Sequence, residues 1–512
     1  MFRRTAALAV LALALTGCSS GTPSPSTQPS LSPSRVESGS PSGPSGGDDP
    51  ALAVYYDQTP DWSRCQGGDQ CTKIKVPLDY AHPAGKKISL ALVRVPATAG
   101  HPIGSLVVNP GGPGASGIQY AELATSYFDS QVLKNFDIVG FDPRGVGAST
   151  PVECLDTART DRFVALDPDP DTAAEVRTFD DAMTALGKAC QRRSGDLIAH
   201  VSTVEAAKDI DVIRSVLGEQ KLNYFGASYG TYLGATYAGL FPKRVGRMVL
   251  DGVIDPSVST LDMSLVQAHG FQVALQAYVA NCVAKGSCYL GSTVAAGIAT
   301  FNAFLADVDK KPLPTTSSRE LTEGNAVLGI WATLYSRSSW SYLDLAMKAA
   351  LGGNGNVLML LSDSYTNRGP NGYRDNSLAA LYAINCLDHD DPVPSSKITQ
   401  YLPRFEKASS TFGRIFAYGM ESCQDWPVQS GHAGVEIHAR GAGPIILIGT
   451  TRDPATPLVW AESLARQIPS AILIKRNGDG HTGYHDGNSC VDNTVNAYLV
   501  SGTVPTKKEI SC

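Results

Sequence analysis

A series of short apolar segments constrains the fold of this chain more than any other feature. These segments lie at residues 105–109, 136–142, 222–227, 247–252, 444–449 and 471–475. Segments with helical spacing separate several of them, for example 204–217 and 171–191, where Thr172 and Glu175 have the spacing of a capping box. Strands that are apolar throughout and alternate with helices are typical of a parallel sheet covered on both faces. The sequence therefore predicts an α/β fold with a mostly parallel central sheet.

The pattern changes at two places along the chain. Residues 73–79 and 88–96 alternate between apolar and polar positions, which favours an antiparallel pair at the start of the sheet. Between residues 256 and 443 the strand pattern stops, and helical sequence interrupted by Gly takes its place. We expect 256–443 to be a largely helical cap, inserted between a first core part at 51–255 and a C-terminal core part at 444–512.

The first fifty residues have the pattern of a targeting segment. Arg3 and Arg4 precede an apolar stretch that is too short to span a hydrocarbon core of roughly 30 Å. The stretch ends in Leu-Thr-Gly-Cys, which resembles a bacterial lipobox; the alternative is an ordinary secretory signal. We expect 1–18 to be a lipoprotein signal peptide with a lipidated Cys18. Residues 19–50, rich in Ser, Pro and Gly, are expected to be a disordered linker. The expected location is the outer face of the cell membrane, with release to the medium as an alternative.

The cysteine content fits an oxidising compartment. The chain has 11 Cys, and an even set remains when Cys18 is set aside; in an exported chain such a set most simply forms disulfides. The sequence leaves the connectivity open. Pairing each Cys with the next one requires the fewest long loop closures. That hypothesis gives the pairs 65–71, 154–190, 282–288, 386–423 and 490–512. Metal binding is the competing use, but the sequence has no Cys-x-x-Cys and no His-Glu-x-x-His.

Ser228 is the candidate nucleophile. It is the central residue of Gly-Ala-Ser-Tyr-Gly at 226–230, which follows an apolar strand and precedes a helical segment. In that context Gly-x-Ser-x-Gly forms a sharp turn that projects the Ser oxygen above the strand ends. The alternative is an ordinary turn without a catalytic role, since Gly and Ser are common residues.

A nucleophilic Ser needs a base and an acid that orients it. Of the nine His, His481 and His485 follow the last apolar strand, and His481 lies in a Gly-flanked loop suited to presenting a side chain. We favour His481 as the base. Asp453, just past the strand at 444–449, is the favoured acid, and Asp251, after the preceding strand, is its rival.

The loop after the strand at 105–109 is rich in Gly. Its sequence, Asn-Pro-Gly-Gly-Pro-Gly, predicts that the backbone N–H of Gly111 or Gly112, together with that of Tyr229, holds a developing oxyanion. The same loop contains Gly-x-Gly-x-x-Gly at 112–117, a dinucleotide fingerprint that is weak when isolated. A nucleotide enzyme would leave the Ser, Asp and His set unexplained.

Two other acidic patterns favour structural interpretations. The acidic segment 167–171 lacks the Gly and distal Glu of a calcium loop and is expected to be a solvated turn. Asp142 and Arg144 lie in a Gly-rich segment without a phosphate-loop Lys, and we expect them to pair with each other near the site.

Taken together, the motifs resemble the tripeptidyl aminopeptidases, exported actinobacterial members of the proline-iminopeptidase group of α/β-hydrolases. The segments that carry the resemblance are 109–114, 141–149, 226–230, 250–252, 453–457 and 481–482. The resemblance implies an α/β-hydrolase fold with a helical cap, and Ser228, Asp453 and His481 as the triad. It also implies a C-terminal part, at about 420–512, typical of these enzymes, and a substrate-site role for Thr456 beside the triad acid. Pro110 stands where iminopeptidases proper have His, which argues against strict proline iminopeptidase activity.

An exopeptidase that recognises a free amino terminus needs a carboxylate to pair with the ammonium group. The cap offers several acids near Cys386 and Cys423, and we predict Asn385 and Asp388 as substrate-binding residues, because a bridge between those two Cys would hold them rigid.

The predicted function is that of an exported serine peptidase that releases short peptides, tripeptides above all, from free N-termini through an acyl-enzyme. A carboxylesterase or lipase with the same triad, an endopeptidase acting on an envelope protein and a non-enzymatic peptide-binding lipoprotein are the alternatives. No cofactor or metal is expected. The net charge of −6 argues against a nucleic-acid partner, because the chain has no excess of basic residues to attract phosphates. The expected partners are a peptide or protein substrate with a free N-terminus and, through Cys18, the membrane.

Overall fold

The computed structural model describes residues 34–35, 50–389, 391–428 and 435–512. Its strands are β1 (Ser34–Arg35), β2 (Ser63–Arg64), β3 (Gln70–Pro77), β4 (Lys87–Val95), β5 (Ser105–Asn109), β6 (Asp137–Phe141), β7 (Leu222–Ala227), β8 (Val245–Asp251), β9 (Arg368–Gly369), β10 (Gly372–Tyr373), β11 (Ile445–Arg452), β12 (Ala471–Asp479), β13 (Thr503–Val504) and β14 (Glu509–Ser511). Ten of them form one sheet in the order β14-β12-β11-β8-β7-β5-β6-β4-β3-β2.

The sheet is parallel from β14 to β6 and antiparallel from there to β2. The predicted mostly parallel sheet is therefore confirmed, and so is the antiparallel pair formed by β3 and β4. The strand order and the helices on both faces are those of an α/β-hydrolase core.

The α-helices account for most of the remaining described residues. They are α1 (Ala53–Tyr56), α2 (Gly117–Glu122), α3 (Ala124–Tyr127), α4 (Ser130–Asn135), α5 (Thr157–Val164), α6 (Ala173–Ser194), α7 (Thr203–Val216), α8 (Tyr229–Leu240), α9 (Thr260–Ala284), α10 (Val294–Lys310), α11 (Glu323–Leu334), α12 (Trp340–Leu351), α13 (Asn356–Tyr365), α14 (Ser377–Asp388), α15 (Ser395–Ala408), α16 (Gly413–Gly419), α17 (Leu458–Gln467) and α18 (Ser489–Ser501). Helices α2, α3, α4 and α18 pack on one face of the sheet, and α7, α8 and α17 pack on the other. The capping box of Thr172 and Glu175 at the start of α6 is confirmed.

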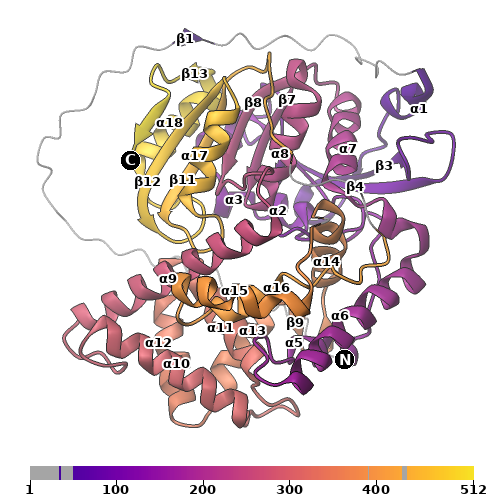
Figure 1. Ribbon diagram of the computed structural model, residues 1–512. Coiled ribbons are helices and arrows are strands. Elements are labelled where there is room, and N and C mark those ends of the chain that lie inside the picture. The colour runs from indigo at the N-terminus through magenta and orange to yellow at the C-terminus, as the bar shows by residue number, and fades with distance from the viewer. Residues whose placement is uncertain (1–33, 36–49, 390, 429–434) are drawn as a thin grey trace, which may run out of the picture.

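The cap, α9 to α16, lies below the sheet in Figure 1 and has its own apolar core around Phe271, Phe301 and Trp340. Residues 157–194, expected to belong to the first core part, also reach this layer. Arg368 of the cap pairs with Asp161 of α5 at 2.6 Å. The helical layer therefore draws on two separate stretches of the chain, because Phe163 of α5 meets Tyr382 of α14 edge to face and Val176 of α6 packs against the cap.

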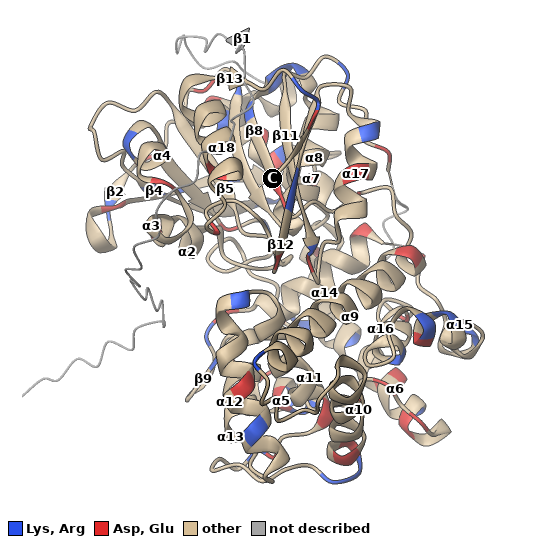
Figure 2. Ribbon diagram, turned by 90° about the vertical axis from the view of Figure 1, so that its left-hand side faces the viewer, with Lys and Arg blue, Asp and Glu red and all other residues tan. Residues whose placement is uncertain are grey.

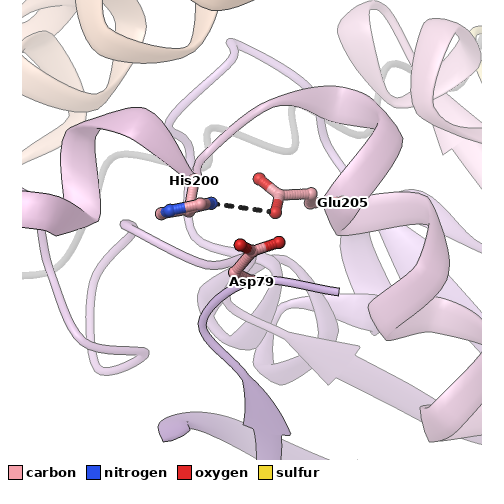
Figure 3. Close-up of side chains that lie close together, drawn as sticks. All are labelled: Asp79, His200 and Glu205. Atoms are coloured by element: carbon pink, nitrogen blue, oxygen red, sulfur yellow. Dashed lines mark hydrogen bonds and ion pairs between the residues drawn. The ribbon is translucent and has the colours of Figure 1, made fainter. Parts of the chain in front are cut away.

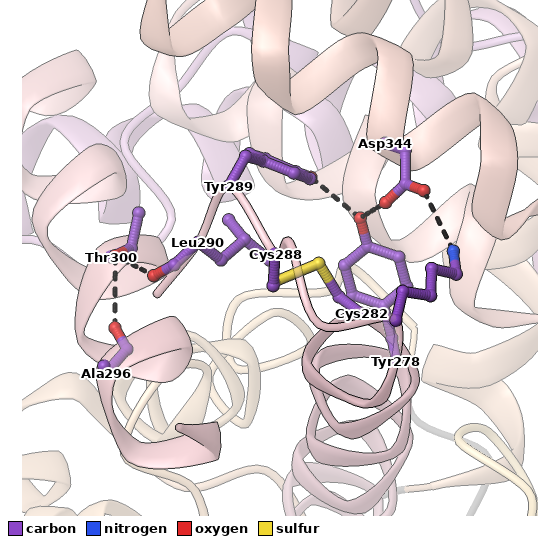
Figure 4. The surroundings of a disulfide bond; sticks show 9 residues. Tyr278, Cys282, Cys288, Tyr289, Leu290, Ala296, Thr300 and Asp344 are labelled. Atoms are coloured by element: carbon purple, nitrogen blue, oxygen red, sulfur yellow. Dashed lines mark hydrogen bonds and ion pairs between the residues drawn. A yellow bond between two sulfur atoms is a disulfide. The ribbon is translucent and has the colours of Figure 1, made fainter. Parts of the chain in front are cut away.

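Five disulfides join each Cys to the next one along the chain, so the sequential pairing hypothesis is confirmed. Two of them lie in the cap, and neither links it to the core. Figure 4 shows the bond between Cys282 and Cys288, which closes the turn after α9. Beside it the hydroxyl of Tyr278 donates to Asp344 at 2.6 Å, which satisfies a polar group in a mostly apolar region.

The expected signal peptide and Cys18 lie outside the described residues, as does most of the linker at 19–50. In the part of the chain that the structure describes, no helix combines the length and the apolar character needed to cross a bilayer. Acidic and basic residues are distributed along the ribbons of both the core and the cap (Figure 2).

Candidate active site

Ser228 lies at the turn between β7 and α8. Its backbone has φ 56° and ψ −127°, a left-handed conformation that a Ser adopts only under strain. A Cβ at Gly226 would lie 2.2 Å from the carbonyl oxygen of Gly230, and a Cβ at Gly230 would lie 2.5 Å from that of Asn109. Both Gly residues of the motif are therefore required by close backbone contacts. The turn holds Ser228 above the strand ends, at the N-terminus of α8.

His481 and Asp453 are in contact. The imidazole Nδ1 of His481 lies 2.9 Å from each carboxylate oxygen of Asp453, which is 1% exposed. The N–H groups of Ala455, Thr456 and Thr482 donate to the same carboxylate. Burial lowers the pKa of His481, but the charge and hydrogen bond of Asp453 outweigh this effect, and the pKa is raised overall. This arrangement favours an imidazolium during the reaction.

Thr456 supports the acid and does not line the cavity that opens at Ser228. Its hydroxyl donates to Asp453 at 2.9 Å and lies 3.2 Å from Nδ1 of His481, and the residue is 2% exposed. The substrate-binding role implied by the resemblance is therefore corrected: Thr456 orients the carboxylate and the imidazole from the buried side.

Asp251, the rival acid, contacts the loop that carries His481. Its carboxylate accepts the N–H groups of Gly483 at 3.1 Å and Tyr484 at 2.8 Å, and its backbone carbonyl accepts the N–H of Ser228 at 2.9 Å. Burial raises its pKa to about 6. Asp251 thus joins the nucleophile turn to the His481 loop, while Asp453 is the carboxylate that bonds the imidazole.

The predicted oxyanion donors differ in availability. The N–H of Gly111 donates to the side-chain oxygen of Asn109 at 3.0 Å, so this group is already engaged. A Cβ at Gly111 would lie within 3 Å of Tyr229 N, which places this Gly against the Ser228 turn. Gly112 lines the same cavity as Ser228. The geometry therefore favours the N–H groups of Gly112 and Tyr229, and it assigns Gly111 a packing role.

The cap takes part in holding the site together. The N–H of His481 donates to the carbonyl oxygen of Tyr335 at 2.8 Å, and the two rings meet edge to face with centroids 5.2 Å apart. Gln267 of α9 donates to the carbonyl oxygen of Ala455 at 2.9 Å. No sequence motif predicts these contacts, because they join segments more than a hundred residues apart.

Asn385 and Asp388, predicted as substrate-binding residues, are not brought to this site. Neither lines the cavity at Ser228. Asp388 is 5% exposed and accepts the N–H of Thr203, at the start of α7, at 2.8 Å; it also accepts the Thr203 hydroxyl, which in turn contacts the hydroxyl of Tyr229. Burial raises the pKa of Asp388 to about 7. The prediction is wrong for Asp388, because this residue ends α14 and its carboxylate is buried against Thr203, whereas the part of α14 that lines the cavity, residues 377–382, lies nearer the start of the helix.

The expected pairing of Asp142 with Arg144 is also wrong. Asp142 accepts hydrogen bonds from Ser116 and from the N–H of Ala148. Arg144 forms a two-bond contact with Asp209, with distances of 2.7 Å, and both side chains are fully buried. The two residues therefore belong to separate networks below the site.

A cavity of about 760 Å³ lies between the core and the cap, and Ser228 and His481 both line it. Its walls are mostly apolar, with Leu166, Phe179 and Trp331 among them. Among the described residues that line it, Asp375 is the one carboxylate, and there is no Lys or Arg. Sequence reasoning missed Asp375, because it lies ten residues before the Cys386 region and carries no motif.

Two groups of side chains have the composition of metal ligands. Figure 3 shows the first, Asp79, His200 and Glu205, where Nδ1 of His200 lies 3.2 Å from a carboxylate oxygen of Glu205. The guanidinium of Arg144 lies 3.6 Å from the same oxygen, and a cation at that position opposes metal binding. The second group is Asp167, Asp309 and Glu323 in the cap. Both groups lie apart from the residues that surround Ser228.

Comparison with known proteins identifies the family. The chain is 36% identical over 474 residues to serine protease Hip1 of Mycobacterium tuberculosis, covering 88% of this chain and 90% of that protein. It is 30% identical over 467 residues to a tripeptidyl aminopeptidase of Streptomyces lividans, covering 88% and 86%. The chain belongs to the tripeptidyl aminopeptidase family. It is 35% identical over 448 residues to carboxylesterase B of Mycobacterium tuberculosis, covering 85% of each chain.

Membership of this family and the α/β-hydrolase core make the protein a serine hydrolase. A family model described as TAP-like protein matches residues 408–512 and so includes Asp453 and His481. An α/β-hydrolase from a deep-sea metagenome library has a TM-score of 0.35 and 12% identity, covering 86% of this chain and 96% of that chain. A likeness that weak adds nothing to the fold that the sheet order already defines.

Proposed function

We propose that the protein is a serine peptidase that releases short peptides, tripeptides above all, from free N-termini. The observation that carries this proposal is the cavity, in which one carboxylate, Asp375, shares largely apolar walls with Ser228 and His481. An ammonium group entering such a cavity has a single anionic partner, and a low-dielectric wall strengthens that attraction. The serine protease and tripeptidyl aminopeptidase relatives support the choice of a peptide as substrate.

The local geometry of Asp375 suits this task. One oxygen accepts from the side chain of Asn367 and the other from the N–H of Ser377, so the carboxylate is held at the start of α14. A carboxylate has about four lone-pair positions, and these two bonds leave room for an ammonium donor. Asp375 therefore replaces Asp388 as the proposed site for the substrate N-terminus.

The reaction follows from the positions of the three candidate residues. His481 takes the proton of Ser228, and the Ser oxygen attacks the substrate carbonyl. Asp453 stabilises the imidazolium, while the N–H groups of Tyr229 and Gly112 hold the oxyanion. His481 then gives the proton to the leaving amine. Water next attacks the acyl-enzyme: His481 takes a proton from the water and returns one to the oxygen of Ser228 as the peptide acid leaves.

The cavity volume supports a short acyl product. Binding pockets for small ligands enclose ~300 to 1,000 Å³, and 760 Å³ lies in the upper half of that range. The cavity lies between the core and the cap, and a substrate that enters it with its terminus first places its first few residues there. We also propose that the protein is exported and held at the outer face of the membrane through Cys18, an assignment that the five disulfides support.

The test compares three substrates with one acyl group: a tripeptidyl amide with a free amino end, its N-acetylated form and the corresponding methyl ester. We expect the purified protein to release intact tripeptide from the free amide at least tenfold faster than from the acetylated one, as read by mass spectrometry. Ser228→Ala abolishes all three reactions. Equal cleavage of the free and acetylated amides would make the protein an endopeptidase.

Two variants test Asp375 itself. Asp375→Asn is expected to raise KM for the free tripeptidyl amide and to leave the acetylated amide unaffected, because only the former carries the ammonium. Asp391→Asn is the matched control, since Asp391 is an exposed acid of the cap that bonds Thr260 and does not line the cavity. An unchanged KM in Asp375→Asn would exclude this residue as the ammonium partner.

A carboxylesterase is the second candidate function. The mostly apolar wall and the 35% identity to carboxylesterase B favour it. Turnover of the methyl ester with no cleavage of either amide would establish this function in place of the peptidase.

A further inference from the structure

His481 lies between two cavities. The first is the 760 Å³ cavity that also contains Ser228. The second, of about 210 Å³, is also lined by His481 but not by Ser228. Tyr120, Tyr127 and Tyr335 line both, so the two spaces meet beside the candidate base.

The chemistry of the reaction requires space on both sides of His481. When the bond from the carbonyl carbon to the leaving nitrogen breaks, that nitrogen receives the proton first taken from Ser228, and it must then lie against Nε2 of His481. This Nε2 atom is buried and has no hydrogen-bond partner among the described residues. The acyl part stays on Ser228, so the leaving part extends past His481 toward the second cavity.

The second cavity reaches the protein surface. Ser126, His485 and Asp486 line it and are exposed, and Tyr127 is 40% exposed. The first cavity also reaches the surface, since Leu123 and Tyr365, which line it, are 43% and 42% exposed. A polypeptide whose first residues occupy the first cavity can therefore extend past His481 and leave through the second.

The charged and aromatic groups of the second cavity suit a cation. Its described lining contains the carboxylates of Asp251 and Asp486 and no Lys or Arg. One carboxylate oxygen of Asp251 is buried and has no partner among the described residues. Arg476 pairs with Asp486 from outside the lining, and no Lys or Arg of the described residues forms an ion pair with Asp251. Tyr120 and Tyr484 also line this cavity, and the face of an aromatic ring attracts cations.

We propose that this second cavity is the leaving-group subsite, which binds the residue after the scissile bond and prefers a basic side chain to an acidic one. The proposal rests on the peptidase activity proposed above. It assigns a substrate preference to residues outside the triad and outside the acyl cavity.

The first experiment varies the leaving group and keeps the acyl group constant. Tripeptidyl-Lys amide and tripeptidyl-Glu amide are given to the purified full-length protein, with the tripeptidyl methyl ester as a reference whose methanol product needs no subsite. We expect kcat/KM to be at least tenfold higher for Lys than for Glu. Equal values for Lys and Glu would overturn the assignment.

Two single substitutions locate the effect. Ser126→Lys places a cation at the mouth of the second cavity and is expected to lower the Lys to Glu ratio at least fivefold. Thr125→Lys adds the same charge one residue earlier, at an exposed position that lines neither cavity, and should leave the ratio unchanged. An equal change in both variants would show a general charge effect and reject the subsite.

A pair of esters keeps the inference testable if the protein cleaves no amide. The tripeptidyl choline ester and the 3,3-dimethylbutyl ester have leaving groups of the same shape, and only choline is charged. Faster turnover of the choline ester, reduced by Ser126→Lys, would support the subsite even though the peptidase proposal had failed. Equal turnover of the two esters would reject it.

Discussion

The backbone N–H of His481 donates to the carbonyl oxygen of Tyr335 at 2.8 Å, so a residue at the end of cap helix α11 fixes the position of the candidate base. A Cβ at Gly480, the residue before His481, would lie 2.9 Å from the same carbonyl. The catalytic loop and the cap are thus packed backbone to backbone. A displacement of the cap would therefore also move His481. The position of the cap sets both the shape of the cavity and the position of the candidate base.

The hydroxyl of Thr456 is expected to be essential for orienting Asp453 and His481. Thr456→Val removes the hydroxyl and keeps the shape, and we expect kcat to fall about 10²-fold, the usual result of a small misplacement at a reacting group. Thr456→Ser retains the hydroxyl and should keep most of the activity. Steady-state kinetics on the tripeptidyl amide measures both, and similar activity in the Val and Ser variants would contradict the assignment.

Asp251 is expected to raise the pKa of His481. The carboxylates of Asp251 and Asp453 both stabilise the imidazolium of His481. Tyr120 and Tyr484 are the other titratable groups that interact with the carboxylate of Asp251. Asp251→Asn can still accept the loop N–H groups but loses the charge. We expect the acidic limb of the pH profile of kcat/KM to move down by ~0.5 to 1 pH unit.

The control for this shift is Asp492→Asn. Asp492 accepts the N–H of His485 in the same loop and does not contribute to the pKa of His481. If both variants moved the acidic limb equally, the effect would come from a disturbed loop and not from the charge of Asp251.

The buried carboxyl of Asp388 should make stability depend on pH. Its pKa rises from 3.8 to about 7 in the folded protein, so the protonated form is favoured there. The associated stability is present below pH 3.8 and is lost as the pH rises toward 7. Asp388→Asn resembles the protonated form, and its stability relative to the wild type should increase by ~2 to 4 kcal/mol between pH 4 and pH 8. Urea unfolding at both values measures this difference, and a constant difference would refute it.

Removing the cation from the fully buried pair of Arg144 and Asp209 should destabilise the core strongly. Arg144→Met leaves the carboxylate of Asp209 without its cation, which typically costs ~3 to 5 kcal/mol. The double variant Arg144→Met with Asp209→Leu removes both charges and should recover most of the loss. Denaturant unfolding of the two variants measures both losses. If the loss came only from poorer packing, the double variant would be less stable than Arg144→Met.

The sequence predicted the strands and the candidate triad because both leave local signals. Ser228 lies in a motif whose Gly residues are required by contacts within a few ångströms, and Asp453 and His481 each follow an apolar strand. The parallel order of β7, β8, β11 and β12 then brings their carboxyl ends to one edge of the sheet.

The proposed partner of the substrate N-terminus could not be predicted in the same way. Asp375 lies just before α14 and lines the cavity, whereas Asp388 ends the same helix and is buried against Thr203, so the choice depends on where each end of α14 lies in the fold. Arg144 pairs with Asp209, which lies 65 residues further along the chain. Asp142, the acid nearest to Arg144 in sequence, is not its partner. Long-range pairing of this kind has no signature in a single sequence.

The local character of the five disulfides has a consequence for the order of events during synthesis. A chain emerges N-terminus first, and here the cysteines of the described residues pair in order of appearance, with the second of each pair at most 37 residues after the first. Bonds that form as soon as two thiols are available are then already the native ones. Oxidation can keep pace with emergence, and maturation of this chain needs little rearrangement by disulfide isomerases.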